Sequence, residues 1–316
     1  MADIQKTPFV RDLASSDRKI RDKALESLTL FLRSRNDLSV LDLLKLWKGL
    51  FFCFYHSDRP LTQQALARAL SYSLVPSLPH ATLHRFLRAF WITIGRDFHS
   101  IDRLRLDKYL FLIRCYVGVA FQVLIKDKKN SPNEDGKKRK REDSGKKGRG
   151  KKQKKQEESE PVQEEDVSEE DGKWADLSAY ISIIEDGPLC PVNFDPDQPS
   201  DDLDLDYVSM PHGPDGLRYH LVDIWIDELE KVLEFEGEGE ESEEGTQNRK
   251  IKGDVPMELI LRPLEKLRTE SPYKPVRTRA TEALEDERLV EWGIRAPQTN
   301  DGDEEDSDGE WGGFDD

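Results

Sequence analysis

The sequence is poor in cysteine and has no long apolar run. Its three cysteines, Cys53, Cys115 and Cys190, lie far apart in the chain, which excludes a disulfide scaffold and a zinc site built from paired cysteines. The longest unbroken apolar run, residues 50–55, is much shorter than a membrane-spanning helix, and residues 1–10 lack the apolar segment of a secretory signal. We therefore expect a soluble protein of a reducing intracellular compartment, with no membrane partner.

Apolar side chains are also scarce for a chain of this length. Of its 316 residues, 36% are hydrophobic and 35% are charged, and the formal net charge is −16. A single core running from one end to the other is not expected, because it would need more apolar surface. The composition predicts a folded body with solvated, charged segments.

Charges of opposite sign are segregated along the chain. Residues 1–125 carry 19 Lys/Arg and 11 Asp/Glu, a net of +8, whereas residues 174–316 carry 13 and 39, a net of −26. Residues 126–155 hold 15 basic side chains, and residues 156–172 hold nine acidic side chains and no basic one. Without apolar anchors such a segment cannot offset the entropy of ordering, so 126–172 is predicted to be a disordered, basic-then-acidic insert.

Acidic residues also concentrate in two later segments. Six of the ten residues in 236–245 and nine of the sixteen in 301–316 are acidic. We interpret 236–253 as an acidic disordered loop and 297–316 as an acidic tail.

The rest of the N-terminal sequence has the periodicity of amphipathic helices. Apolar residues recur at helical spacing over residues 17–35, 39–56, 60–74, 80–94 and 102–125. Ser16 is the expected N-cap of the first of these helices, and Pro60 lies in the first turn of the third. The apolar stripe of 102–125 is wider than a surface helix needs, which predicts a central helix covered on two sides.

The predicted fold class is all-α. Short connections and the absence of a strand pattern favour antiparallel helix pairs over 1–125, stacked as an irregular HEAT/armadillo-like solenoid or an irregular bundle, although no fixed repeat period is present. After the insert, helices are predicted at 174–185, 217–235, 257–268 and 273–292, with a kink or restart at Pro263. We expect the C-terminal helices, within 254–296, to extend the same stack.

A proline-rich and acidic segment separates two of these later helices. Residues 186–217 contain six prolines and eight aspartates and no Lys or Arg, which predicts extended chain. Its charge is opposite to that of the N-terminal body. We therefore expect 173–235 to comprise a short helix, a strap and a helix packed on the N-terminal domain, with the strap anchored by Phe194, Leu203, Leu205, Tyr207, Val208 and Met210.

Motifs for catalysis are missing from the sequence. It has no His-Glu-x-x-His, no phosphate-binding Gly-Lys-Ser/Thr loop and no Gly-x-Ser-x-Gly. His80 and His84 are one helical turn apart, but no third metal ligand with suitable spacing is visible, and zinc normally needs three or four. Cys53 and Cys115 lie on apolar helical faces, where packing is the expected role. We predict no catalytic residue, no metal site and no cofactor.

The insert carries the strongest local signal. Its basic residues form two clusters, spaced as in a bipartite nuclear import signal that importins would bind. The same clusters could neutralise RNA phosphates without reading sequence, and since no aromatic residue is interleaved, base stacking is not expected. A linker that only solubilises the chain is the alternative. The residues are Lys137, Lys138, Arg139, Lys140 and Arg141, then Lys146, Lys147, Arg149, Lys151, Lys152, Lys154 and Lys155.

Three stretches of the helical sequence carry a family resemblance. LKLWKGLFFC at 44–53, followed by SDRPL at 57–61, resembles the signature of the eukaryotic ribosomal RNA-processing protein 1 family, which consists of nucleolar factors. IDRLRLDKY at 101–109 resembles the second conserved block of that family, and PDGLRYHLVDI at 214–224 resembles the third. The resemblance covers roughly 1–125 and 205–290.

The resemblance implies a function that composition and periodicity do not. It implies an all-helical scaffold of the nucleus and nucleolus that joins precursors of the large ribosomal subunit and is needed for processing the internal spacer between the 5.8S and large rRNAs. It also implies contacts with pre-rRNA, Brix-domain assembly factors and a WD40-propeller protein. The chain departs from the family pattern in its acidic tail, so functions of a long basic tail do not carry over.

The signature residues have physical interpretations of their own. Trp47 and Lys48 belong to this block, and Gly49 inside a helix costs ~1 kcal/mol relative to Ala, which suggests that another group approaches it closely. Asp58, or Ser57, can cap the helix that Pro60 opens. We interpret these residues as structural.

The second block has two readings. A structural role is the first, with Asp107 one helical turn beyond Arg103. The second is a basic ridge for rRNA phosphate or an acidic partner, formed by Arg96, Arg103, Arg105 and Lys108.

The tail ends in two aromatic residues. Trp311 and Phe314 lie in an acidic, glycine-spaced context. They form a candidate motif for docking into a basic, apolar groove, with an inert tail as the alternative.

The sequence favours a noncatalytic nucleolar assembly factor of the large ribosomal subunit. It would bind partner proteins and pre-rRNA by shape and charge. A nuclear transport adaptor or histone-type chaperone is one alternative, and an RNA-processing enzyme of unrecognised type is the other.

Overall fold

The computed structural model describes residues 12, 13, 15, 17–126, 173–193, 208–236 and 249–296, and this part of the chain is helical. The only β pairing among these residues is an isolated bridge between Phe235 and Ile251. The all-α class predicted from the sequence is therefore confirmed. The helices are α2 (Arg18–Arg33), α3 (Val40–Tyr55), α4 (Pro60–Arg68), α5 (His80–Asp97), α6 (Arg103–Phe121), α9 (Ala175–Asp186), α10 (Asp215–Glu230), α11 (Met257–Glu270), α12 (Lys274–Leu284) and α13 (Glu287–Glu291).

Side-chain caps begin several of the helices. Asp17, rather than the expected Ser16, caps α2, because its carboxylate accepts from the backbone N–H of Lys19 at 2.8 Å. Ser39 caps α3 through the N–H of Asp42, and Asp102 caps α6 through the N–H of Arg105. Each cap satisfies a backbone donor that the first turn leaves unpaired.

The start of α4 corrects one prediction. Pro60 occupies its first turn as expected, but the N-cap is Arg59 and no side chain caps the helix. Neither Asp58 nor Ser57 has the predicted capping role. The fixed φ of proline is already suited to a first helical turn, which explains why α4 begins without a side-chain cap.

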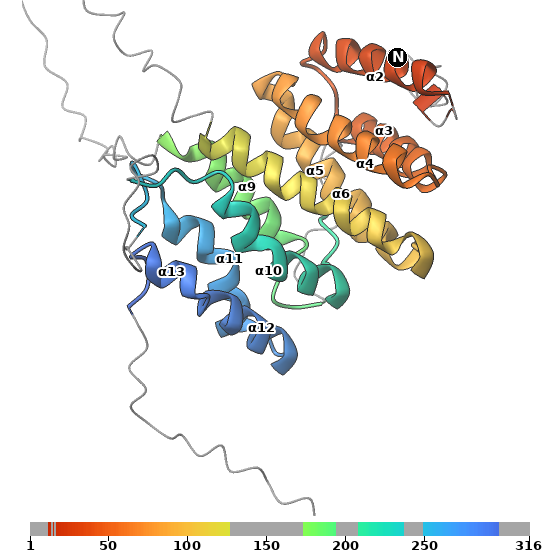
Figure 1. Cartoon of the computed structure of the whole chain (residues 1–316). Helices are drawn as coiled ribbons and strands as arrows, with labels where there is room; N and C mark the ends of the chain where they lie inside the picture. The colour runs from red at the N-terminus through yellow and green to blue at the C-terminus, as the bar shows by residue number, and fades with distance from the viewer. Residues whose placement is uncertain are drawn as a thin grey trace, which may run out of the picture.

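The main helices are arranged in two rows. In the first row α3 packs on α5, α5 on α9 and α9 on α11, while in the second α4 packs on α6, α6 on α10 and α10 on α12. Contacts between α3 and α4 and between α11 and α12 join the rows. The stack follows chain order, from α2 at one end to α12 and α13 at the other (Figure 1). Helix pairs stacked in two layers are the architecture of an α-solenoid.

Helix α6 lies at the centre of this arrangement, as its wide apolar stripe predicted. It contacts α4 on one side and α10 on the other, and Tyr109, Ile113, Tyr116 and Phe121 are fully buried. The segment from Arg103 to Lys126 is the one described helix long and apolar enough to cross a bilayer, and 72% of its most apolar window is buried inside the fold. Its apolar surface is thus covered by neighbouring helices.

Three helical segments differ from the prediction in helix type or continuity. Helices α4 and α6 continue into π-helical turns, 69–73 and 122–126, which periodicity did not indicate. The helix predicted over 273–292 is broken at Asp286, which caps the separate helix α13. Pro263 neither restarts nor interrupts α11, which runs through it.

The described part of the predicted strap lies along α5. Arg88 donates to the carbonyl of Val208 at 2.8 Å, and Met210 is 2% exposed. A Cβ on Gly95 would lie 2.8 Å from the ring of Pro211, which is closer than two non-bonded carbon atoms can approach. Glycine is therefore required on α5 at this crossing. The other expected anchors, Phe194, Leu203, Leu205 and Tyr207, are outside the described residues.

Candidate functional site

Two of the predicted ridge residues hold the end of α3 against the start of α6. Lys108 donates to the carbonyls of Tyr55 and Ser57, at 2.7 and 2.8 Å, and Arg105 Nε donates to the carbonyl of Tyr55 at 3.2 Å. The carbonyl of Tyr55 belongs to the last turn of α3 and that of Ser57 follows it, at the end of the helix where backbone acceptors have no partner within the helix. Cations are favourable at this end of a helix because it carries partial negative charge.

Carboxylates complete this contact, which we call the α3–α6 clamp and which consists of Tyr55, Asp58, Asp102, Arg105 and Lys108. Asp102 accepts from Arg105 Nη1 at 2.6 Å and from the Tyr55 hydroxyl at 2.8 Å. Asp58, the predicted cap, instead lies 3.5 Å from Arg105 Nη2 and 3.8 Å from Lys108 Nζ. The clamp therefore joins the first and second signature blocks.

The pKa shifts in the clamp follow from these contacts. Hydrogen bonds from Arg105 and then from Tyr55 lower the pKa of Asp102, and the bond to Asp102 raises the pKa of Tyr55. Burial lowers the pKa of Lys108. The two hydrogen bonds to Asp102 favour its charged form, so Asp102 and Arg105 form an ion pair at neutral pH.

The ridge residues consequently differ in accessibility. Lys108 is 8% exposed and Arg105 is half-buried in the clamp, whereas Arg96 and Arg103 are exposed. Asp107 is also exposed. A contact with RNA phosphate or an acidic partner stays a prediction, and Arg96 and Arg103 are the ridge residues whose side chains could reach one without disrupting the clamp.

Apolar side chains are also exposed on the helices that the clamp joins. Leu104, next to Arg103, is 93% exposed, and Phe52 on α3 is 48% exposed. Lys48 pairs with Asp97 at 2.7 Å, which holds α3 beside the end of α5 that carries Arg96. Large apolar side chains near exposed cations are typical of binding surfaces. We call Lys48, Phe52, Arg96, Arg103 and Leu104 the corner surface.

Trp47, on the inner side of α3, lies in an aromatic cluster. Its ring centroid is 5.2 Å from that of Phe86, 4.9 Å from that of Phe90 and 5.3 Å from that of Tyr116. The Tyr116 hydroxyl donates to the carbonyl of Leu70 at 2.7 Å. This signature residue thus packs α3 against α5 and α6. Gly49 is partly buried on α3, and the group that approaches it stays a prediction.

The two helical cysteines are also part of the core. Cys53 and Cys115 are 7% and 4% exposed, and burial raises the pKa of each thiol to about 11. A thiol with a raised pKa holds its proton at neutral pH and is a poor nucleophile. Packing, as predicted, is the role that this environment supports.

The third signature block is built around buried charge. Arg218 on α10 is fully buried, and its guanidinium donates to Asp215 at 2.6 Å and to Asn193 at 3.0 Å. Burial lowers the pKa of Arg218, and the nearby Asp215 opposes that shift. The contact ties the start of α10 to the segment that follows α9.

Ion pairs extend from α6 through α10 to α13. Arg114 donates to Glu228 at 2.5 Å and to Asp227 at 2.7 Å. Arg288 on α13 donates to Asp227, at 3.1 Å, and to Glu230, at 2.9 Å. No pattern in the sequence pointed to this network, because its members lie more than fifty residues apart on different helices and resemble ordinary surface charges.

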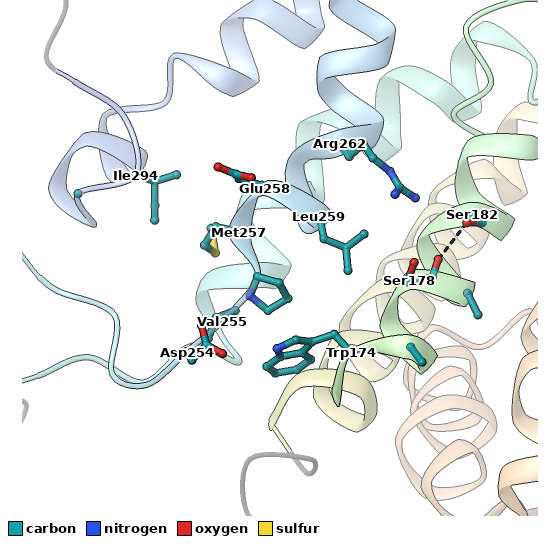
Figure 2. Close-up of a pocket in the computed structure, with 14 residues that line it drawn as sticks. Trp174, Ser178, Ser182, Asp254, Val255, Met257, Glu258, Leu259, Arg262 and Ile294 are labelled. Carbon is teal, nitrogen blue, oxygen red and sulfur yellow. Dashed lines mark hydrogen bonds between the residues drawn. The ribbon is translucent and has the colours of Figure 1, made fainter. Parts of the chain in front are cut away.

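An open groove lies at the other end of the first row. It has a volume of about 1150 Å³ between the start of α9, the start of α11 and the segment after α13. Trp174, Met257 and Leu259 supply apolar walls, and Asp254 and Glu258 supply acidic ones (Figure 2). Arg262 is directed to Glu185, to which it donates at 2.7 Å. The groove can hold a ligand, but none of its described lining residues pairs a nucleophile with a base.

Several predicted site residues are outside the described part of the chain. Nothing is described for the two basic clusters of the insert, 137–141 and 146–155, or for Trp311 and Phe314 of the tail. Their roles in nuclear import, phosphate contact and docking stay predictions.

The described architecture defines an all-α protein of stacked helix pairs, and the comparisons with known proteins place it more closely. The chain belongs to the Nop52 family of nucleolar proteins, whose sequence profile matches residues 4–135 and 207–312. The match covers the three signature blocks, so the resemblance seen in the sequence is confirmed. The nuclear and nucleolar localisation predicted from it is confirmed as well.

The relatives are much longer than the part this chain matches. The chain is 30% identical over 229 residues to human ribosomal RNA processing protein 1 homolog B, a match that covers 71% of this chain and 22% of that protein. It is 38% identical over 121 residues to the mouse homolog B, covering 37% of this chain and 17% of the relative. Human homolog A is 37% identical over 117 residues, covering 35% and 25%.

Proposed function

We propose that the chain is a noncatalytic assembly factor of the large ribosomal subunit that acts in pre-rRNA processing as a helical binding scaffold. The names of its relatives, ribosomal RNA processing protein 1, support the process. The observation that carries the scaffold role is the corner surface, where exposed basic and apolar side chains on α3, α5 and α6 are held in place by the α3–α6 clamp and the Lys48–Asp97 pair. Such a surface binds by position and charge and needs no reactive group.

Each region of the chain has a separate role in this function. Residues 1–125 form the N-terminal helical domain that carries the corner surface, and 173–235 and 254–296 continue the stack. The basic half of 126–172 contacts RNA phosphates and is read by importins, while 297–316 and the acidic part of 236–253 are solvated; residues 249–252, by contrast, pair with the end of the α10 segment. Each of these assignments rests on charge and on the contacts between described helices.

The expected partners are those of an early precursor particle. They are pre-rRNA, Brix-domain assembly factors and a WD40-propeller assembly factor. Arg96 and Arg103 suit phosphate or carboxylate groups, and Phe52 and Leu104 suit the apolar centre of a protein interface. We therefore assign protein partners to the apolar part of the corner surface and RNA or acidic protein to its arginines.

Charge reversal at the corner surface tests this proposal. We expect the double variant Arg96→Glu/Arg103→Glu to leave the thermal unfolding midpoint nearly unchanged, because both side chains are exposed, and to lose sedimentation with large precursor particles. The matched control is Lys250→Glu/Lys274→Glu, which makes the same charge change at exposed positions away from the corner.

The outcomes of this experiment separate the alternatives. Equal recovery of both variants in large precursors would remove the corner surface from the proposal. A wild-type chain that sediments only with importins or histones would favour a transport adaptor or chaperone. Cleavage of spacer RNA by the purified chain would favour an enzyme.

A further inference from the structure

The fold brings a third metal-binding side chain to the histidine pair of α5. His80 and His84 are one helical turn apart, and Asp176 lies in the first turn of α9, 92 residues beyond His84. His80 Nε2 is 2.9 Å from Asp176 Oδ1, and His84 Nε2 is 3.4 Å from the same oxygen. The ligand that the sequence pattern did not reveal therefore comes from the helix packed beside α5.

The three donor atoms have the spacing of a metal site. All three lie within 4.8 Å of one another. A tetrahedral zinc ion with bonds of ~2.0–2.2 Å separates its ligand atoms by about 3.3 Å, so small rotations of these side chains would place all three around one ion. His80 can rotate readily because its side chain is 74% exposed, and the same exposure leaves room for a water as fourth ligand.

The chemistry of the donors selects the class of metal. Two imidazoles and one carboxylate suit zinc and similar divalent transition metals, whereas Mg²⁺ and Ca²⁺ prefer oxygen ligands alone. His84 Nδ1 is buried and has no hydrogen-bond partner among the described residues, so the ring proton that Nε2 shares with Asp176 can move to Nδ1 when a metal displaces it. Nε2 can then bind a metal as a neutral ligand.

We propose that His80, His84 and Asp176 form a binding site for one divalent transition-metal ion, with zinc as the expected occupant. The ion would join the first turns of α5 and α9. That contact lies where the chain re-enters the stack after residues 127–172, between the N-terminal and C-terminal helices of the first row. Metal binding would strengthen this junction without taking part in a reaction.

Zinc titration of the full chain tests the site. Calorimetry in excess Mg²⁺, which occupies weak acidic sites, should show one zinc bound per wild-type chain, and Co²⁺ should give the visible absorption of a tetrahedral site. The exposed position of His80 makes His80→Ala a variant that folds, and Asp176→Asn keeps an oxygen acceptor but loses the charge. Each should weaken zinc binding at least ~10-fold, the low end of what lost supporting contacts cost at metal sites.

The matched control is His99→Ala, which removes an exposed histidine after the end of α5. It should bind zinc as the wild type does. If His80→Ala and Asp176→Asn also bind zinc with wild-type affinity, the metal is held elsewhere in the chain and the proposal is wrong. Failure of the wild type to bind zinc or Co²⁺ would overturn it equally.

Hydrogen exchange gives an independent readout at the junction. Zinc should slow amide exchange in 175–186 of the wild type and of His99→Ala, because the ion fixes α9 on α5. It should have no effect on 175–186 in His80→Ala. Slowing of exchange in that variant as well would show that zinc acts through other ligands, which contradicts the assignment.

Discussion

The N-terminal and C-terminal halves of the stack share one apolar core but differ in the other contacts that join their helices. Around α3, α5 and α6 the contacts are aromatic, with Trp47 and Tyr116 buried at the centre. Between α6, α10 and α13 the contacts are ion pairs centred on Arg114 and Arg288. One architecture therefore combines a region whose packing is rich in aromatic contacts with a region in which partly buried ion pairs are added to the apolar packing. The two regions should respond differently to truncation, pH and salt.

The largest effect is expected in the aromatic cluster. Trp47→Ala removes a side chain that is 2% exposed and contacts three rings, so we expect a loss of ~3–5 kcal/mol in the free energy of unfolding. Urea unfolding followed by circular dichroism measures it. Phe52→Ala on the outer face of α3 is the control and should change stability by less than ~0.5 kcal/mol. Equal losses in the two variants would contradict the packing assigned to Trp47.

A smaller loss is expected at the α6–α10 ion pair. Glu228 is 2% exposed, and Arg114→Met leaves it with Lys231 as its remaining partner, so we expect a loss of ~1–3 kcal/mol. The double variant Arg114→Met/Glu228→Gln should recover part of this loss, because it removes the unpaired charge. Arg279→Met, at a pair with Asp223 in which both side chains are exposed, is the control. Strict additivity in the double variant would show that the pair is not coupled.

The third effect in order of size is a loss of stability in acid at the ion pairs of α10 and α13. The hydrogen bond from Arg288 lowers the pKa of Asp286, and bonds from Arg114 and Arg288 overcome burial to lower that of Asp227. A carboxyl with a lower pKa in the folded state contributes stability above its unfolded pKa and loses it as the pH falls through the folded pKa. Unfolding midpoints from pH 7 to pH 3 should therefore converge for the wild type and Arg288→Met. A constant difference would refute this linkage.

The smallest effect is expected at the exposed pair on the corner surface. Lys48→Gln breaks the contact with Asp97, and since the Lys48 side chain is 49% exposed, we expect a loss of ~0.5 kcal/mol that salt abolishes. Paired urea titrations at low and high salt measure it, with Lys23→Gln at an exposed position of α2 as the control. A loss as large as that of Arg114→Met would mean that this exposed pair stabilises the N-terminal half as strongly as the buried pair stabilises the C-terminal half.

The sequence predicted what depends on local periodicity. The helices, the central position of α6 and the first-turn role of Pro60 follow from neighbouring residues, which is why they could be read without a structure. The predicted cap of α4 was wrong because the Asp58 carboxylate faces Arg105, a residue that is distant in the sequence, and not the first turn of α4. The break before α13 was missed because the apolar spacing continues across Asp286.

The candidate site was harder to predict because its parts come from separate helices. The clamp partners of Lys108 are carbonyls of α3, and sequence patterns carry no information about backbone acceptors fifty residues away. The carboxylate beside His84 lies beyond a long charged segment, so no spacing rule could connect them.

The place where residues 127–172 join the stack has a consequence for how this family can vary. The chain leaves after the π-helical turn at 122–126 and returns at α9, and those two elements touch. A change in the length of a loop between these two elements adds little entropy cost, since the cost of closing a loop grows only with the logarithm of its length. The charged segment 127–172 can therefore be lengthened, exchanged or deleted while the order of the helices on either side is preserved.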